Sequence, residues 1–150
     1  MTRSERLGVV QQATAHVERE HADRVAQAER HVVAMEEKLG ALERYRKEYE
    51  EGFATRAGAG VGVAAGRDYQ AFLARLGDAI EQQRKVIGDA RAAHQAAVLV
   101  WRDAAKRAHV VDTLAERWQV EESREEGRRD QRDSDELSQQ IRFRNREGKT

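Results

Sequence analysis

The sequence predicts an all-α fold, an elongated antiparallel two-helix coiled coil whose second helix is the longer one. Three observations lead to this prediction. The 150-residue chain contains no proline, 36% of its residues are charged, and only 5% are aromatic. Apolar residues recur every three or four positions along most of its length, as in a coiled-coil seam. Five of the eleven glycines gather between Gly52 and Gly66 and divide the periodic pattern in two.

The first helix is expected over residues 1–53. Thr2 and Glu5 fit a capping box, in which a helix-initiating hydroxyl and a carboxylate satisfy each other's backbone N–H groups. The helix should then place one apolar seam toward its partner. Two spacings of four in succession at His21–Val25 predict a local stutter in the supercoil. The expected seam is Leu7, Val10, Thr14, Val17, His21, Val25, Ala28, Val32, Met35, Leu39, Leu42, Tyr45, Tyr49 and Phe53.

A hairpin loop is expected over residues 54–66, because each glycine opposes helix formation by about 1 kcal/mol relative to alanine. The second helix is expected over residues 67–118. A reversal of the chain makes the two helices antiparallel, and pairing Phe53 with Tyr69 makes the numbers of facing residues add up to about 122. The expected seam is Tyr69, Phe72, Leu76, Ile80, Gln83, Ile87, Ala90, His94, Ala97, Trp101, Ala104, Ala108, Val111, Leu114 and Trp118.

Residues 119–150 form a charged extension that outlasts the first helix. Apolar residues are almost absent there until Leu137, so periodicity leaves helix and disorder both open. Pairs such as Glu125 with Arg129, four residues apart, favour helix. The last six residues, 145–150, are expected to be disordered. The four segments together are expected to form one domain.

The composition argues against several classes of function. The 27 basic and 27 acidic residues are intermixed, so no segment is basic enough to indicate nucleic acid as a partner. No cysteine is present, and no apolar run is long enough to suggest a signal peptide or membrane insertion. The glycine cluster lacks the Gly-Lys-Ser or Gly-Lys-Thr of a phosphate-binding loop. No catalytic residues, cofactor or enzyme activity are therefore expected.

A metal site is not expected either. The predicted pairing brings His31 within a turn of His94, and His16 within a turn of His109. Two histidines rarely hold a metal alone, and no third ligand is evident.

Several stretches together resemble the FliJ family, the stalk and general chaperone of flagellar type III protein export. They are the Leu39–Tyr49 and Tyr69–Arg84 segments on either side of the hairpin, the Trp101-Arg102 pair, and the acidic run at 130–136. The resemblance covers nearly the whole chain. It implies a non-enzymatic antiparallel coiled coil, similar to the central stalk of rotary ATP synthases, that inserts into the hexameric export ATPase.

The resemblance also implies a contact with the cytoplasmic domain of the export-gate membrane protein, and handling of escort chaperones. The positions that match the family's gate contact are Phe72, Leu76, Ala79 and Gln83. They lie on one helix face, so packing against the first helix is the alternative explanation for three of them. Trp118, where the first helix runs out, is a candidate contact with the ATPase ring or else a seam residue.

This function places the protein in the cytoplasm, peripherally associated with the inner membrane at the export apparatus. Two other functions remain open on sequence grounds. One is the equivalent stalk of a virulence injectisome, and the other is a generic coiled-coil scaffold or adaptor without an export role.

Overall fold

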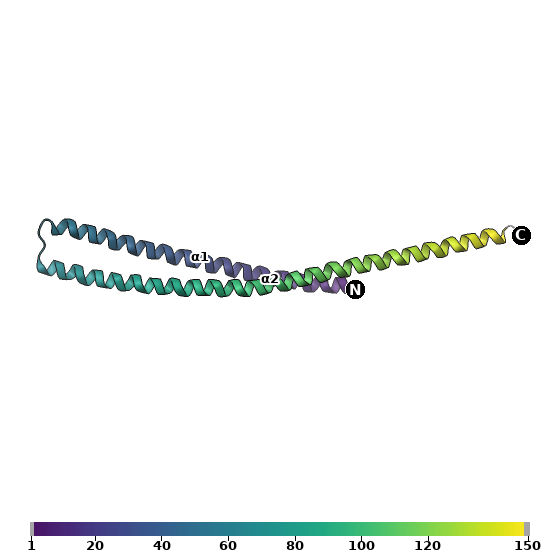
Figure 1. Cartoon of the computed structure of the whole chain (residues 1–150), viewed down its shortest axis with the longest axis horizontal. Coiled ribbons are helices and arrows are strands. Elements are labelled where there is room, and N and C mark those ends of the chain that lie inside the picture. The colour runs from purple at the N-terminus through teal and green to yellow at the C-terminus, as the bar shows by residue number, and fades with distance from the viewer. Residues whose placement is uncertain (1, 149–150) are drawn as a thin grey trace. The chain divides into compact units, whose positions relative to one another are not determined.

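The computed structural model of the chain describes residues 2–148. It contains two helices, α1 (Arg3–Ala57) and α2 (Val63–Glu147), which pack against each other (Figure 1). No strand occurs within the described residues. The predicted fold class is confirmed: the protein is all-α, and its second helix is the longer one.

The start of α1 is fixed by the predicted capping box. The backbone N–H of Thr2 donates to Oε2 of Glu5 at 2.8 Å, and the N–H of Glu5 donates to the Thr2 hydroxyl oxygen at 3.1 Å. These two bonds satisfy donors that the first turn of a helix leaves without an intrahelical partner. The cap therefore sets where α1 begins.

The turn between the helices is shorter than the expected 54–66 loop. Helix α1 continues to Ala57 and α2 begins at Val63, so only residues 58–62 are non-helical. Gly60 has a φ of +93°, a backbone conformation that favours glycine, and its N–H donates to the Ala57 carbonyl at 3.1 Å. The expectation counted residues 54–57 and 63–66 as loop residues, but the helix-forming residues there keep both stretches in helix.

The described chain groups into two compact units. One unit, the hairpin unit, comprises Arg19–Asp103 and contains the turn. The other, the terminal unit, combines the chain up to Glu18 with the chain from Ala104 onward. Each unit is described by itself.

The hairpin unit pairs the C-terminal part of α1 with the N-terminal part of α2. The rings of Phe53 and Tyr69 stack with centroids 3.7 Å apart, and the rings of Tyr49 and Phe72 lie 4.3 Å apart. Gln83 contacts Met35, farther from the turn on both helices. The predicted antiparallel register is confirmed by these contacts. The buried core is Leu76, Ile80, Gln83, Ile87 and Ala90, all on α2.

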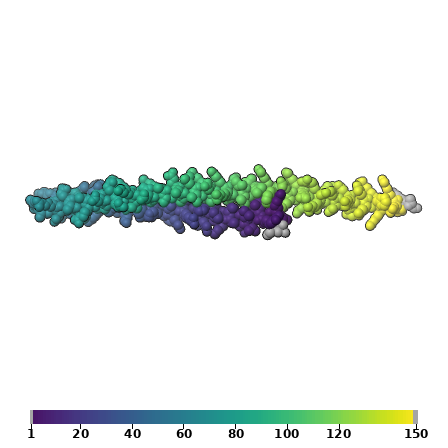
Figure 2. All heavy atoms as spheres, turned by 90° about the horizontal axis from the view of Figure 1, so that it is seen from below, coloured from purple at the N-terminus to yellow at the C-terminus, as the bar shows by residue number. Residues whose placement is uncertain are grey.

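The terminal unit pairs the start of α1 with α2 in the same antiparallel sense. Gln11 donates from Nε2 to Oδ1 of Asp112 at 2.8 Å, and Arg3 forms a 2.9 Å ion pair with Glu121. Its buried residues are Ala104 and Ala115. In Figure 2 the dark N-terminal segment lies along α2, and the yellow C-terminal part of α2 continues without it.

The C-terminal part of α2 remains helical to Glu147, which resolves the question the sequence left open. Every described residue from Ser123 to Gly148 is exposed. The predicted Glu125–Arg129 pair forms at 3.0 Å. Residues 145–147, expected to be disordered, are helical, whereas 149 and 150 lie outside the described residues.

Every predicted seam position of α2 is buried or half-buried, although the prediction missed the buried Ala115, whereas the seam of α1 departs from the prediction. Val10, Val17 and Tyr45 are exposed, and Gln11 and Glu18 are half-buried beside the two valines. One series of half-buried positions along this part of α1 alternates between steps of four and three, with small residues half-buried beside it at Gly8, Ala15, Ala22 and Ala26. The predicted stutter was therefore wrong, because a continuous heptad register overrides the greater hydrophobicity of valine. The positions of this series are Leu7, Gln11, Thr14, Glu18, His21 and Val25.

Candidate partner-binding surfaces

The four residues predicted to contact the export gate do not form one open stripe. Leu76 and Gln83 are buried against α1, and Phe72 is half-buried, whereas Ala79 is exposed. The helical spacing that places them on a common face also turns most of that face toward α1. Packing within the hairpin unit therefore accounts for three of the four positions, and Ala79 is the one that faces solvent.

Among residues 2–148, Gln83 is the only buried polar side chain. Its amide Nε2 donates to the Met35 carbonyl oxygen at 2.9 Å and lies 3.5 Å from the Met35 sulfur. A buried amide needs such a partner, because an unsatisfied polar group costs free energy when it leaves water. The bond satisfies the Gln83 amide and joins α2 to α1 within the hairpin unit.

An aromatic cluster surrounds Phe72 at the turn end of the hairpin unit. The Phe72 ring lies edge-on to Tyr45 at a centroid distance of 5.9 Å, and Tyr49 stacks on Tyr69 at 5.5 Å. Tyr45 keeps 50% of its surface exposed. The sequence placed Tyr45 in the seam and missed it as a surface residue. Its contact with Phe72 follows from the pairing register, which was the available signal.

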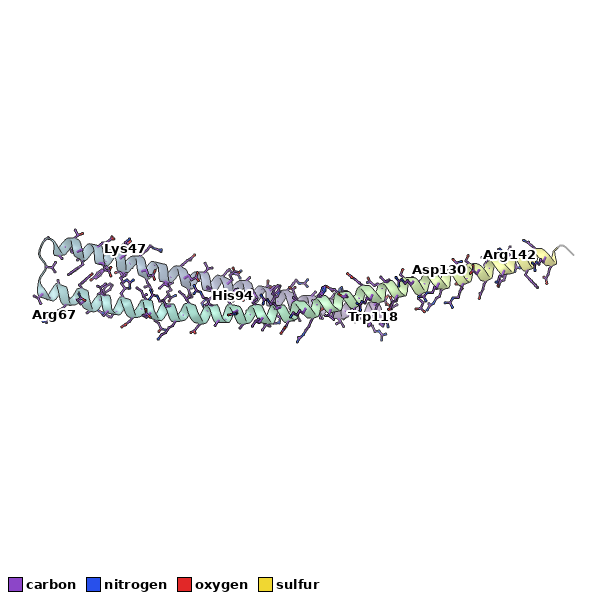
Figure 3. The ribbon with its side chains drawn as sticks, viewed as in Figure 1. Lys47, Arg67, His94, Trp118, Asp130 and Arg142 are labelled. Atoms are coloured by element: carbon purple, nitrogen blue, oxygen red, sulfur yellow. The ribbon has the colours of Figure 1, made fainter. Side chains whose placement is uncertain are left out.

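Trp118 lies half-buried near the start of α1, as its position in the sequence suggested. The Arg3 guanidinium carbon stands 4.2 Å from the centre of the indole ring, a cation–π contact. Arg3 also forms an ion pair with Glu121, so this one side chain joins the N-terminal end of α1 to two positions of α2. Figure 3 labels Trp118 where the described part of α1 begins beside α2.

Near Trp118, Ser4 forms hydrogen bonds with Glu122. The Ser4 hydroxyl and backbone N–H both donate to the Glu122 carboxylate, the latter at 3.2 Å. The hydroxyl bond is the main cause that lowers the pKa of Glu122 below its ordinary value, since it favours the charged form. A lowered pKa in the folded chain means that this contact adds stability above the ordinary carboxyl pKa. The contribution is lost as the pH falls through the lowered value.

Neither unit carries the elements of a metal site or of a membrane span. Within residues 2–148, no three His, Asp or Glu side chains gather closely enough to hold a metal ion. Over the same residues, neither helix has a stretch apolar and long enough to cross a lipid bilayer.

Comparison with known families decides the identity of the chain. A family model described as "Flagellar FliJ protein" matches residues 3–147, which include both helices and the turn. The chain belongs to the FliJ family. No curated protein and no solved structure matches it.

As a FliJ-family protein, the chain is a non-catalytic component of flagellar protein export. This favours the flagellar function over the injectisome stalk and the generic scaffold. The match extends through the exposed C-terminal part of α2, so that part belongs to the family's pattern. The family resemblance inferred from the two aromatic segments and from the order of the later motifs is thereby confirmed.

Proposed function

We propose that this FliJ-family protein is the stalk of the hexameric flagellar export ATPase. The observation that carries the proposal is the terminal unit, in which a short helix pair gives way to a single exposed helix. The pair ends where Arg3 and Ser4 contact residues 118–122 of α2. Beyond this pair, every residue of the chain from Ser123 through Gly148 is exposed to solvent. A central stalk needs such a helix, which is exposed on all sides and can meet the walls of a surrounding ring.

The proposed stalk has no internal symmetry, and this gives it a physical means of acting on the ring. Each ATPase subunit would meet a different set of side chains along the extension and the helix pair. Differential contact free energy with the subunits is what shifts their conformational equilibria. Trp118 is the proposed anchor, since a half-buried aromatic at the edge of a coil offers a large contact area.

Adding the purified protein to its cognate ATPase is expected to raise the rate of ATP hydrolysis several-fold and to promote hexamer formation. Trp118→Ala should weaken both effects by removing the proposed anchor. Trp101→Ala is the matched control, because it makes the same substitution in the part of α2 that belongs to the hairpin unit. It should leave the stimulation of hydrolysis and of hexamer formation unchanged. Phosphate release and sedimentation report the two effects. An unchanged hydrolysis rate at saturating stalk would refute the stalk function.

The export gate is the second proposed partner. Its cytoplasmic domain would dock on Ala79, on the accessible edge of Phe72, and on exposed Tyr45 of α1. Leu76 and Gln83 would support this surface from within, by holding α1 against α2. In this way the residues that the family resemblance assigns to the gate act partly through contact and partly through position.

Ala79→Arg is expected to weaken binding of the gate domain tenfold or more, because a long charged side chain would enter the proposed contact. The helix should be unaffected, since Ala79 is exposed and arginine is a good helix former. Ala74→Arg provides the control, because Ala74 is exposed on a different face of the same helix. Calorimetric titration measures both affinities. Equal affinities of the two variants for the gate domain would show that Ala79 does not contact it.

The remaining parts of the proposal are the escort chaperones and the location. Exposed Leu99 and Val100 on α2 offer an apolar surface of the kind that helix-in-groove recognition uses, which supports chaperone binding. The ATPase and gate contacts together would hold the protein in the cytoplasm, peripherally associated with the inner membrane. The equal numbers of acidic and basic residues support protein partners over nucleic acid.

A further inference from the structure

The C-terminal extension, residues 123–147 of α2, exposes apolar side chains that nothing in the described chain covers. Leu137, Ile141 and Phe143 keep 58%, 51% and 64% of their surfaces exposed. Leu137 and Ile141 are one helical turn apart and share a face. An apolar set at this spacing is typical of a helix that packs against another helix.

The extension also has little internal stabilisation. Its local side-chain contacts include the Glu125–Arg129 pair and a 3.1 Å bond from Gln131 to Asp135, each worth a few tenths of a kcal/mol. In proteins most of the stability of a helix comes from packing of one face, and no face of the extension is packed within the described chain. A packing partner would therefore stabilise the helix as well as cover its apolar residues.

The charges of the extension identify the partner. Residues 130–136 contain four acids and one base, whereas residues 137–147 contain three bases and one acid. Figure 3 labels Asp130 and Arg142 in these two halves. A second extension laid antiparallel would set each acidic half against a basic half. A parallel arrangement would set like charges together, which is unfavourable.

The same antiparallel arrangement brings the apolar residues together. With Gln139 at the two-fold axis, Leu137 lies at the level of Ile141 of the second copy, and Glu136 at the level of its Arg142. Each match occurs twice because the interface is two-fold symmetric. The Leu137–Ile141 and Glu136–Arg142 matches thus agree on one alignment.

We propose that two copies of this protein associate through antiparallel pairing of their C-terminal extensions, centred near Gln139. The inference is independent of the ATPase function. It does imply competition, because the second copy covers the helix that the proposed ring would surround. The protein would then self-associate only while it is not bound in the ATPase ring.

Sedimentation equilibrium of the full chain tests the proposal. The average mass is expected to rise with protein concentration from 17.0 kDa toward twice that value, and to fall back as salt screens the charges. A mass of 17.0 kDa at every concentration would overturn the proposal.

Two charge-reversal variants test the interface. R142E/R144E/R146E makes both halves acidic, and D133R/D135R/E136R makes both halves basic, so each alone should remain monomeric. Mixing them should restore association, since opposite halves face each other again. R67E/K85E/R102E reverses three exposed bases outside the extension and should associate like the wild type. Association of either extension variant alone, or no recovery on mixing, would contradict the pairing.

Orientation is tested by cysteine crosslinking, which is simple because the natural chain has no cysteine. E136C mixed with R142C should form a mixed disulfide faster than either variant crosslinks to itself. Faster self-crosslinking of E136C would indicate a parallel arrangement and overturn the proposed geometry.

Discussion

Replacing Ile80 with alanine is expected to lower the free energy of unfolding by about 2–4 kcal/mol, through lost burial and the cavity left behind. Ile80 is the most deeply buried large side chain described, with 1% of its surface exposed. It lies between Leu76 and Gln83 in the core of the hairpin unit. In a two-helix structure no further layer of side chains can move in to fill the space.

Thermal and urea unfolding followed by circular dichroism measure this loss. Val100→Ala is the matched control: it truncates another β-branched residue of α2 within the same unit, but an exposed one. Its unfolding midpoint should stay close to that of the wild type. Equal shifts for the two variants would mean that Ile80 does not face α1.

Gln83→Glu is the second substitution expected to have a large effect, although it changes the shape of the side chain very little. Gln83 is only 7% exposed and donates its amide proton to the Met35 carbonyl. A carboxylate cannot donate that bond, and its charge would face a carbonyl oxygen away from water. A loss of about 2–3 kcal/mol is expected at neutral pH.

The loss should depend on pH in a definite direction. Burial favours the neutral carboxylic acid, so the pKa at position 83 of the variant is raised in the folded chain. The variant therefore gains stability relative to the wild type as the pH falls through that raised pKa. The protonated acid can again donate to the carbonyl.

Gln82→Glu makes the same chemical change at the exposed neighbouring position. Gln82→Glu should change the free energy of unfolding little, both at neutral pH and at the lower pH where Gln83→Glu regains stability. Parallel pH series of urea unfolding for both variants make the comparison. If Gln83→Glu behaved like Gln82→Glu throughout, the amide would not be buried against α1.

The sequence predicted the two helices, their order and their register because each rests on a strong local signal. The capping box at Thr2 and Glu5, the turn glycines and the apolar spacing of α2 all appear in the structure. The exact length of the turn was not predictable from glycine density. Gly52 and Gly66 remain helical because the residues around them outweigh a cost of about 1 kcal/mol each.

Along α1 the prediction failed where hydrophobicity and register disagree. Val10 and Val17 are more apolar than Gln11 and Glu18, yet the polar residues occupy the interface positions. The first half of α1 keeps one heptad phase, so a single residue cannot move into the seam without displacing its neighbours. Gln11 compensates for its polarity with the bond to Asp112.

The candidate site shows a different limit. Periodicity placed Phe72, Leu76 and Gln83 on one face, but spacing alone does not distinguish a face that binds a partner from one that packs internally. The pairing with α1 is needed to make that distinction. It also reveals Tyr45, whose exposed ring adjoins Phe72 from the other helix. The helicity of 123–147 was likewise open, because apolar residues are absent from that stretch until Leu137.

The two units bury different kinds of side chain. The hairpin unit buries leucine and isoleucine, whereas the terminal unit buries only Ala104 and Ala115 and is joined by Arg3, Ser4 and Gln11. An alanine methyl removes little apolar surface from water, so the pairing of the chain ends depends more on charge and hydrogen bonding than the pairing within the hairpin unit does. Acid and salt should accordingly separate the helices of the terminal unit at temperatures where the hairpin unit stays folded. The stability of the terminal unit would then respond to pH and ionic strength, whereas that of the hairpin unit would depend mainly on its apolar core.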